Sequence, residues 1–501
     1  MADTKREIER KYESEDSGLP DLTGVAGVET VVDKGVAHLD ATYYDTPDER
    51  LAAAAITLRR RTGGSDAGWH LKFPVAPGVR DEIQAPLSDT LPRSLAGLIR
   101  SRVRDAELLP VVRLLSDRDV RDLVDSEGRL LAEVSVDAVR AERLTVDGGT
   151  AQWTELEVEL ADGGDPAFLD KVDKRLRKAG VRPSKSASKL ARALAETTPK
   201  KKRRKQPAAR EPVTAGDHVL AYVREQRDAI VTLDPAVRQD TYDSVHRMRV
   251  ATRRMRSAFR SYGKVLDRTV TDPIGDELKW LAGELGVDRD AEVLTERLTA
   301  ALDELPRTLF SGPIRTRLRT WTHARRGGSR RRLTGVLDSK RYLALLDALD
   351  ALVDDPPLLE AAAGQPEKVI AKAVRKDFRK LSGLVEQAVA LKPGQDRDLA
   401  LHEARKKAKR TRYSAEAAAP GLGSPASALA KSMKSLQSLL GDHQDSVMTR
   451  QTLRELSAVA HAAGESSFTY GVLYGREEAA AAAVERDLPG AWQEVKGGMQ
   501  V

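Results

Sequence analysis

Carboxylates and cations recur at every second position in several segments of the first 196 residues. Acidic residues predominate on one face of some segments, and arginine or lysine predominates on others. The acidic positions include Glu7, Glu9, Glu155, Glu157 and Glu159, and the basic positions include Arg59, Arg61 and Lys72. Carboxylate oxygens are ligands that Mg²⁺ and Mn²⁺ prefer, and guanidinium and ammonium groups bind phosphate oxygens. The two sets together indicate a site for a phosphate chain with a divalent metal.

A spacing of two residues is the period of a β-strand, so these segments predict strands with one polar and one apolar face. In one of them, His70 and Lys72 oppose Trp69, Leu71 and Phe73. Glycine pairs mark turns between the strands, and helical patterns occupy residues 91–104 and 166–180. An ordinary sheet with one solvated face is the simpler interpretation. A barrel with its polar face inward would instead gather both charge types in one lumen, where buried charge must be paired or bind a ligand.

A second group of cations lies on one predicted helix in the C-terminal half. His246, Arg249, Arg253, Arg256 and Arg260 fall on one face at helical spacing, opposite an apolar face. We call this set the basic stripe. Like charges at this spacing destabilise a helix, and a bound polyanion would relieve their repulsion. Double-stranded DNA is a rival ligand, but no helix-turn-helix or comparable reader is evident, so no specific nucleic acid is expected.

The basic stripe recurs later in the chain. His402, Arg405, Lys409 and Arg412 repeat the offsets of His246, Arg249, Arg253 and Arg256. Leu285-Gly286 and Leu440-Gly441 follow the two copies at similar distances. Two equivalent halves with a common basic groove are predicted. Arg375 and Arg379 share a face of a further basic helix. No second histidine or carboxylate lies four residues after His246 or His402, so hydrogen bonding or anion binding is favoured over a metal site.

Composition divides the chain into three parts. Residues 1–196 hold 30 Lys/Arg against 36 Asp/Glu, residues 197–212 hold 7 against 1, and residues 213–501 hold 46 against 39. The middle part is predicted to be a basic flexible linker. Residues 213–501 are rich in alanine and leucine, with proline and glycine punctuation, which predicts helical bundles. The absence of cysteine excludes disulfides and thiolate chemistry.

The strand segments of residues 5–195 resemble the CYTH, or triphosphate-tunnel, family. Glu7, Glu9 and Lys11 resemble its ExExK signature, and residues 43–47 (YYDTP) resemble its turn. Residues 58–61, 71–74, 155–159 and 186–190 resemble four further elements in the same order. The resemblance implies an antiparallel barrel that binds triphosphate with Mg²⁺ or Mn²⁺ and hydrolyses its terminal phosphoryl group.

The same resemblance implies site residues. The metal ligands would be Glu7, Glu9, Glu155, Glu157 and Glu159. The triphosphate-binding residues would be Lys11, Arg59, Arg61, Lys72, Arg80, Arg113 and Lys185. No general base is identified. Gln84 replaces a carboxylate of the family pattern. That departure supports one alternative, a barrel that binds polyphosphate without hydrolysing it; another is a nucleotide enzyme, an adenylate cyclase or thiamine triphosphatase.

The C-terminal repeat resembles CHAD, the conserved-histidine α-helical domain family. Residues 246–256 resemble its HxxRVxxRRLR signature, and residues 402–413 and 436–445 resemble its second-half motifs. At residues 289–293, Glu292 replaces one aspartate of the family motif. The resemblance implies two helical bundles with pseudo-two-fold symmetry that bind inorganic polyphosphate. The polyphosphate-binding residues would be His246, Arg249, Arg253, Arg256, Arg260, Arg375, Arg379, His402, Arg405, Lys409 and Arg412.

The sequence therefore predicts an α+β antiparallel barrel over 1–196, a linker over 197–212 and an all-α domain of two pseudo-symmetric bundles over 213–501. The predicted function is a metal-dependent triphosphatase or short-chain polyphosphatase with a polyphosphate-binding domain. No run of 18 apolar residues and no apolar leader segment is present. A cytoplasmic protein without a membrane partner is expected, and polyphosphate binding would bring it to polyphosphate granules.

Overall fold

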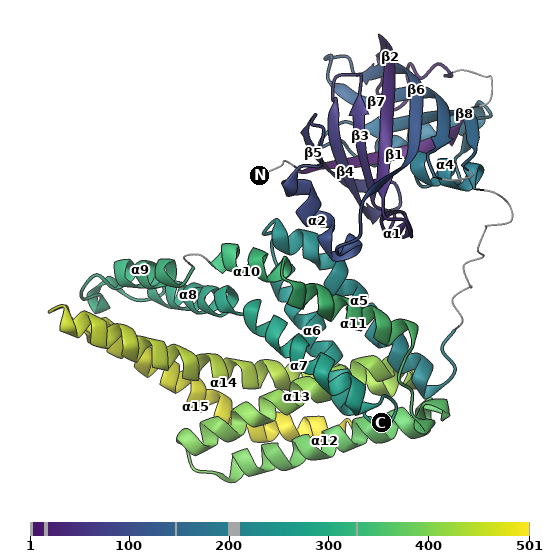
Figure 1. Ribbon diagram of the computed structural model, residues 1–501. Helices are drawn as coiled ribbons and strands as arrows, with labels where there is room; N and C mark the ends of the chain where they lie inside the picture. The colour runs from purple at the N-terminus through teal and green to yellow at the C-terminus, as the bar shows by residue number, and fades with distance from the viewer. Residues whose placement is uncertain (1–3, 15–18, 146–147, 199–210, 327–328, 500–501) are drawn as a thin grey trace. The chain divides into compact units, whose positions relative to one another are not determined.

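The chain divides into two compact units, Met1–Ala208 and Ala209–Val501 (Figure 1). The computed structural model describes residues 4–14, 19–145, 148–198, 211–326 and 329–499, without the side chains of 287–291, 325, 326 and 329. Most of the predicted linker, residues 199–210, lies outside the described residues.

The first unit is a closed antiparallel barrel of eight strands (Figure 1). The strands are β1 (Thr4–Glu13), β2 (Thr30–Asp45), β3 (Thr57–Thr62), β4 (Gly68–Ala76), β5 (Val79–Pro86), β6 (Leu109–Val124), β7 (Leu130–Arg143) and β8 (Thr150–Leu160). They follow the order β5-β4-β3-β2-β6-β7-β8-β1, and β1 also pairs with β5. A short strand, β9 (Arg182–Pro183), pairs with β1. The predicted α+β antiparallel barrel is confirmed.

Helices cover the apolar outer face of the barrel, which leaves its polar face inward. They are α1 (Arg50–Ala53), α2 (Arg93–Val103) and α3 (Ala167–Lys178). Helix α4 (Lys189–Thr197) instead packs against inward-facing strand residues, with Leu190 and Ala193 in one cluster with Tyr43, Val139 and Trp153. Leu95 and Ile99 of α2 pack on Leu71 and Ile83 of the strands, and all four side chains are fully or almost fully buried. Burying these side chains stabilises the fold by roughly 1.5–3 kcal/mol each. The alternation of polar and apolar residues thus places polar side chains inside the barrel and apolar side chains in a core between the sheet and the helices outside it.

Helices are the regular elements of the second unit over its described residues, apart from one isolated bridge between Leu266 and Leu358. Its helices are α5 (Ala215–Arg238), α6 (Ser244–Ser261), α7 (Arg268–Glu284), α8 (Val287–Asp303), α9 (Ile314–Arg326), α10 (Ser329–Leu337), α11 (Lys340–Asp354), α12 (Pro366–Ala390), α13 (Gln395–Leu422), α14 (Ser424–Ala462) and α15 (Phe468–Gly497). Two short 3₁₀ segments are η2 (Arg307–Leu309) and η3 (Glu360–Ala363). Thr214 and Asp217 form a capping box that fixes the start of α5.

The helical unit has two similar halves around a common core. Helices α5, α6 and α7 pack in sequence order in the first half, and α12, α13 and α14 do so in the second. Helices α6 and α13 contact each other, and side chains of both halves belong to one continuous core. The halves differ at the repeated glycines, because Gly286 separates α7 from α8 whereas Gly441 lies within the continuous α14.

Candidate functional site

The barrel encloses a cavity of about 690 Å³, which we call the tunnel. Its walls are the inward faces of the strands, so side chains two residues apart line it together. Nine predicted site residues line the tunnel: Glu7, Glu9, Lys11, Arg59, Arg61, Lys72, Arg80, Glu157 and Glu159. Glu155 is buried beside it, on the same strand face as Glu157. The strand period thus gathers side chains from five strands around one space.

One end of this charge network is organised by Lys189, the first residue of α4. Its Nζ lies 3.1 Å from Asp137, 2.8 Å from Glu155 and 2.7 Å from Glu157. Arg118 also binds Asp137 through two hydrogen bonds of 2.8 and 2.9 Å. Burial opposes the charged form of Lys189, but the three carboxylates raise its pKa above the usual range. These acids are therefore already neutralised by cations of the chain.

Lysines from two further strands bridge the remaining acids. Lys11 contacts Glu157 and lies 3.0 Å from Glu9. Lys72 lies 2.6 Å from Glu7 and 3.4 Å from Glu82. These ammonium groups lie between the carboxylates and also face the tunnel.

Arginines crowd another wall of the tunnel. Burial, together with Arg59 and Arg118, lowers the pKa of Arg61 to about 9. Arg61 is paired with Asp66, and Nη1 of Arg59 donates a long hydrogen bond of 3.4 Å to the Tyr43 hydroxyl. The Nε atoms of Arg59 and Arg61 are buried and have no hydrogen-bond partner among the described residues. Buried donors of this kind are costly, and an anion in the tunnel would satisfy them.

A row of carboxylates crosses three adjacent strands. Glu133 of β7 is directly opposite Glu159 of β8, which is directly opposite Glu9 of β1. Burial and the neighbouring Glu159 raise the pKa of Glu133. Burial also raises the pKa of Glu7 to about 7, with Lys72 opposing the shift and Glu82 adding to it. Like charges placed opposite one another are destabilising, and a cation among them would remove that cost.

Two of the residues predicted to bind triphosphate do not reach the tunnel. Arg113 lies on the outer face of β6, where its exposed side chain pairs with Asp40 at 2.7 Å. It lies five positions before the inward-facing Arg118, and an odd offset along a strand reverses the face. Lys185 is exposed, and Lys189 is the lysine of this segment that lines the tunnel.

Four residues that line the tunnel were not predicted as site residues from the sequence: Glu82, Arg118, Glu133 and Lys189. Lys189 could have been found, because it is the lysine of the segment at 186–190 that resembles a family element. Arg118 has charged neighbours on both sides, Asp117 and Asp119, so no alternation marks its face.

Substitution of Lys189 is expected to destabilise the barrel strongly. Removing one partner of a buried charge cluster typically costs about 3–5 kcal/mol, because the opposite charges stay buried without compensation. Lys189→Met should lower the free energy of unfolding of the barrel transition in urea by this amount. Lys185→Met, at an exposed position in the same segment, should change it by less than about 0.5 kcal/mol. Equal effects of the two substitutions would contradict the structural assignment.

In the helical unit, the two basic stripes meet between α6 and α13. Arg249 and Arg253 of α6 act electrostatically on Lys409 of α13, as does Arg405. Burial, together with Arg405 and Arg253, lowers the pKa of Lys409 to about 8. Asp445 lies 3.8 Å from Arg405 and opposes this shift. We call Arg249, Arg253, Arg405 and Lys409 the central basic cluster.

The repeated glycines lie against this cluster. A Cβ atom on Gly286 would lie 2.8 Å from Nη2 of Arg249, and one on Gly441 would lie 3.4 Å from Nη2 of Arg405. The absence of a side chain at both glycines therefore lets an arginine of the neighbouring helix lie close to the glycine backbone. The Nε atoms of Arg253 and Arg405 are buried and have no hydrogen-bond partner among the described residues.

The other residues predicted to bind polyphosphate occupy varied environments. His246 and Arg260 are exposed on α6, and Arg256 is half-buried next to Arg260. Arg375 and Arg379 are exposed on α12. His402 Nδ1 lies 2.6 Å from the side-chain oxygen of Gln444, so this ring is held by α14. Arg412 donates to Glu416 at 2.7 Å and stacks over Tyr413.

Comparisons with known proteins agree with both domains. The CYTH domain model matches residues 5–194, and the CHAD domain model matches residues 221–454. The chain is a CYTH–CHAD protein. It is 40% identical over 488 residues to "Uncharacterized protein MT2285" and to "Uncharacterized protein Rv2226" of two Mycobacterium tuberculosis strains, CDC 1551 / Oshkosh and H37Rv. The matches cover 94% of this chain and 92% of each relative, so the two-domain arrangement is shared.

Solved structures overlap parts of the CYTH–CHAD chain. PptA from Streptomyces chartreusis is 20% identical, with 56% of this chain and 99% of that chain covered and a TM-score of 0.47. The CHAD domain from the plant Ricinus communis is 23% identical, with 59% and 96% covered and a TM-score of 0.42. Across the described residues, no helix is both long and apolar enough to cross a membrane.

The CYTH family is metal-dependent, and acidic residues are clustered in the barrel. The carboxylate row offers the oxygen donors that such a metal prefers, and Lys11 and Lys5 lie 3.0 and 2.8 Å from its Glu9 and Glu159. Glu7, Glu9 and Glu159 would hold the ion, with Glu133 beside them. The other two predicted ligands are Glu155 and Glu157, and both contact Lys189.

Proposed function

We propose that the barrel is a metal-dependent triphosphatase that hydrolyses the terminal phosphoryl group of inorganic triphosphate or short polyphosphate. The observation that carries this proposal is a single tunnel lined by crowded arginines and by a row of opposed carboxylates. The arginines match the non-bridging oxygens of a phosphate chain, and the carboxylates match its divalent counter-ion. Mg²⁺ or Mn²⁺ bound there would neutralise charge that develops on the phosphoryl and leaving-group oxygens.

The side chains of the barrel would position the substrate. Arg59, Arg61 and Arg118 would bind phosphate oxygens on one wall, and Lys72 and Lys11 would do so from neighbouring strands. Placing these donors before the substrate arrives avoids reorganisation during the reaction, which is where electrostatic catalysis gains most. Burial of Arg61, at 4% side-chain exposure, also excludes water that would screen its charge.

We further propose that the helical domain binds inorganic polyphosphate at the central basic cluster. Buried cations that lower one another's pKa gain stability when an anion binds, and a polyanion can contact several of them at once. Arg256, Arg260 and His246 extend the cluster along α6, and Arg375 and Arg379 offer exposed cations on α12 for a long chain. Association with cytoplasmic polyphosphate granules follows from this binding as a prediction.

A phosphate-release assay over a substrate panel tests the proposed activity. The full chain with Mg²⁺ or Mn²⁺ should release phosphate fastest from tripolyphosphate, more slowly from ATP and thiamine triphosphate, because no base-recognition element is evident in the sequence. A preference for ATP or thiamine triphosphate would favour the nucleotide-enzyme alternative. Binding of tripolyphosphate without phosphate release would favour the non-catalytic alternative, which the amide of Gln84 supports.

Polyphosphate binding by the helical domain is expected to take up a proton. The folded pKa of Lys409 is about 8, so this side chain is about half neutral at pH 8. Polyphosphate favours the ammonium form and raises that pKa, and the affinity therefore falls as pH rises above 8, by up to about tenfold per pH unit. Calorimetry in two buffers of different ionisation enthalpy measures the proton directly. Lys409→Arg, which stays charged, should bind without this uptake; an unchanged uptake would exclude Lys409.

A further inference from the structure

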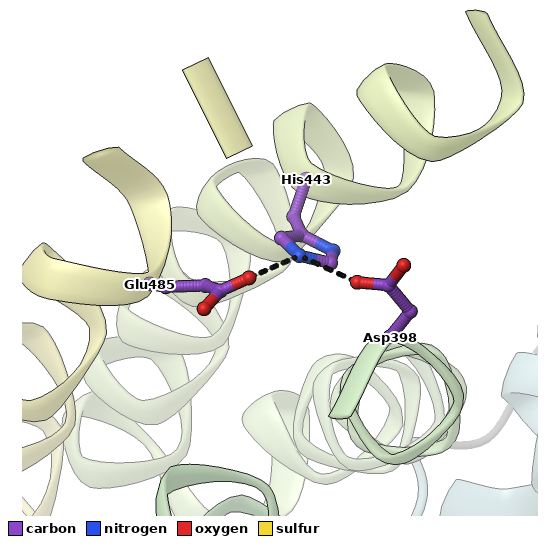
Figure 2. A group of neighbouring side chains, drawn as sticks. All are labelled: Asp398, His443 and Glu485. Carbon is purple, nitrogen blue, oxygen red and sulfur yellow. Dashed lines mark hydrogen bonds and ion pairs between the residues drawn. The ribbon is translucent and has the colours of Figure 1, made fainter. Parts of the chain in front are cut away.

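Three helices of the second half bring one histidine and two carboxylates together. Figure 2 shows Asp398 of α13, His443 of α14 and Glu485 of α15. The histidine side chain is only 1% exposed. Its Nε2 lies 3.3 Å from Asp398 Oδ1 and 3.2 Å from Glu485 Oε1. One nitrogen thus faces two carboxylate oxygens at nearly equal distances.

A hydrogen bond alone explains this arrangement poorly. A single N–H group aims well at one acceptor. Other histidines of the chain form one short contact at each bonded nitrogen: His402 to Gln444 at 2.6 Å and His70 to Glu82 at 2.8 Å. The two longer distances from His443 Nε2 to the carboxylate oxygens instead match the distance between two ligand atoms of one metal ion. A tetrahedral ion with bonds of about 2.0–2.1 Å separates its ligand atoms by roughly 3.3 Å.

The outer oxygens of both carboxylates are held by arginines. Arg397 lies 3.1 Å from Glu485 Oε2, and Arg450 lies 3.5 Å from Asp398 Oδ2. Each carboxylate therefore keeps its other oxygen directed at His443. Metal-binding carboxylates are commonly oriented by such outer contacts. The acid group in the barrel, Asp137, Glu155 and Glu157, is different, because the ammonium of Lys189 lies among its inner oxygens.

We propose that Asp398, His443 and Glu485 form a binding site for a divalent transition-metal ion, with Zn²⁺ as the best match. The three ligand atoms lie within 4.8 Å of one another, so one ion can reach all of them. One imidazole nitrogen with two carboxylate oxygens is a borderline donor set that suits Zn²⁺, Co²⁺ or Mn²⁺ better than Ca²⁺. Water would complete the coordination. The ion would fasten α13, α14 and α15 together, and this inference is independent of the proposed triphosphatase.

Cobalt titration of the full, untagged chain tests the site. After treatment with chelator and its removal, the wild type should bind Co²⁺ with visible ligand-field absorption that an equivalent of Zn²⁺ abolishes. His443→Gln and Asp398→Asn should lose this absorption, whereas Glu142→Gln, a carboxylate change at an exposed position on the outer face of the barrel, should keep it. Equal absorption in wild type and His443→Gln, or no absorption in the wild type, would overturn the proposal.

Thermal unfolding gives a second readout, which the wild type alone can provide. Zn²⁺ that binds the folded state should raise the Tm of the helical domain in the wild type, and removing it with chelator should reverse the rise. Asp398→Asn lies at a partly exposed position and keeps the side-chain shape, so it should fold even where His443→Gln does not, and its Tm should not respond to Zn²⁺. A wild-type Tm that ignores Zn²⁺ would contradict the site.

Discussion

Replacing Glu7 and Glu9 together by glutamine should lower phosphate release from tripolyphosphate by at least about 100-fold, since removing one preorganised electrostatic group already costs that much in typical enzymes. Both side chains are buried in the tunnel, and both belong to the carboxylates that would hold the metal. Glutamine keeps the shape of glutamate but not its charge. Binding of polyphosphate by the helical domain should be unchanged, because that domain has its own basic cluster.

Matched substitutions separate the tunnel from the rest of the barrel. Glu142→Gln changes an exposed carboxylate on the outer face, opposite Arg113 in the strand pairing, and should leave phosphate release intact. The pair Arg59→Ala and Arg113→Ala makes the same comparison for cations: the first arginine lines the tunnel and the second does not. Unchanged turnover in the Glu7/Glu9 variant would remove the hydrolase assignment, whatever the other variants do.

Neutralising Arg253, Arg405 and Lys409 together by glutamine should weaken binding of long-chain polyphosphate by at least about 100-fold. Each hydrogen bond between charged groups contributes about 1.5–3 kcal/mol. The free protein should not be destabilised, because these cations repel one another: Arg405 and Arg253 contribute to the lowered pKa of Lys409. Fluorescence anisotropy with labelled polyphosphate measures the affinity, and urea unfolding measures the stability.

The control for this variant removes three cations elsewhere. Arg268, Arg476 and Lys496 are exposed and paired with Asp272, Glu304 and Glu386. Their replacement by glutamine gives the same net charge as the cluster variant and should change the affinity little. The wild-type affinity should also fall steeply with salt, as release of counter-ions requires. If the cluster variant still binds polyphosphate, the basic stripes are only solvated helix faces. Preferential binding of double-stranded DNA would favour DNA as the ligand.

The sequence predicted the barrel because its strands are amphipathic in a simple way. In β1, β3, β4 and β8, charged and apolar residues alternate, so the sequence of each strand indicates which face points inward. Nine predicted residues line the tunnel. Strand β6 could not be assigned from its own residues, since Asp117, Arg118 and Asp119 are charged on both faces. Its inner face follows from pairing with β2 and β7, which is information outside the strand.

Other site residues depend on contacts between distant segments. Lys189 follows Ser188, the N-cap of α4, and reaches three carboxylates on β7 and β8 that are distant in the sequence. His443 lies 42 residues or more from its acidic partners, with no local periodicity to connect them. In the repeat, equal offsets predicted a common basic groove, and in the structure Arg253 acts electrostatically on Lys409. The adjacent Arg254 and Arg410 instead form ion pairs with Glu416 and Asp377.

Phosphorus NMR of the reaction tests most directly whether the barrel hydrolyses the terminal phosphoryl group of triphosphate, as we propose. With Mg²⁺ or Mn²⁺, the full chain should convert tripolyphosphate to orthophosphate and pyrophosphate in equal amounts, as attack of water on a terminal phosphorus requires. Arg59→Ala should slow both products together, and Arg113→Ala should not. Tripolyphosphate signals that persist unchanged with folded wild-type protein and either metal would contradict the claim.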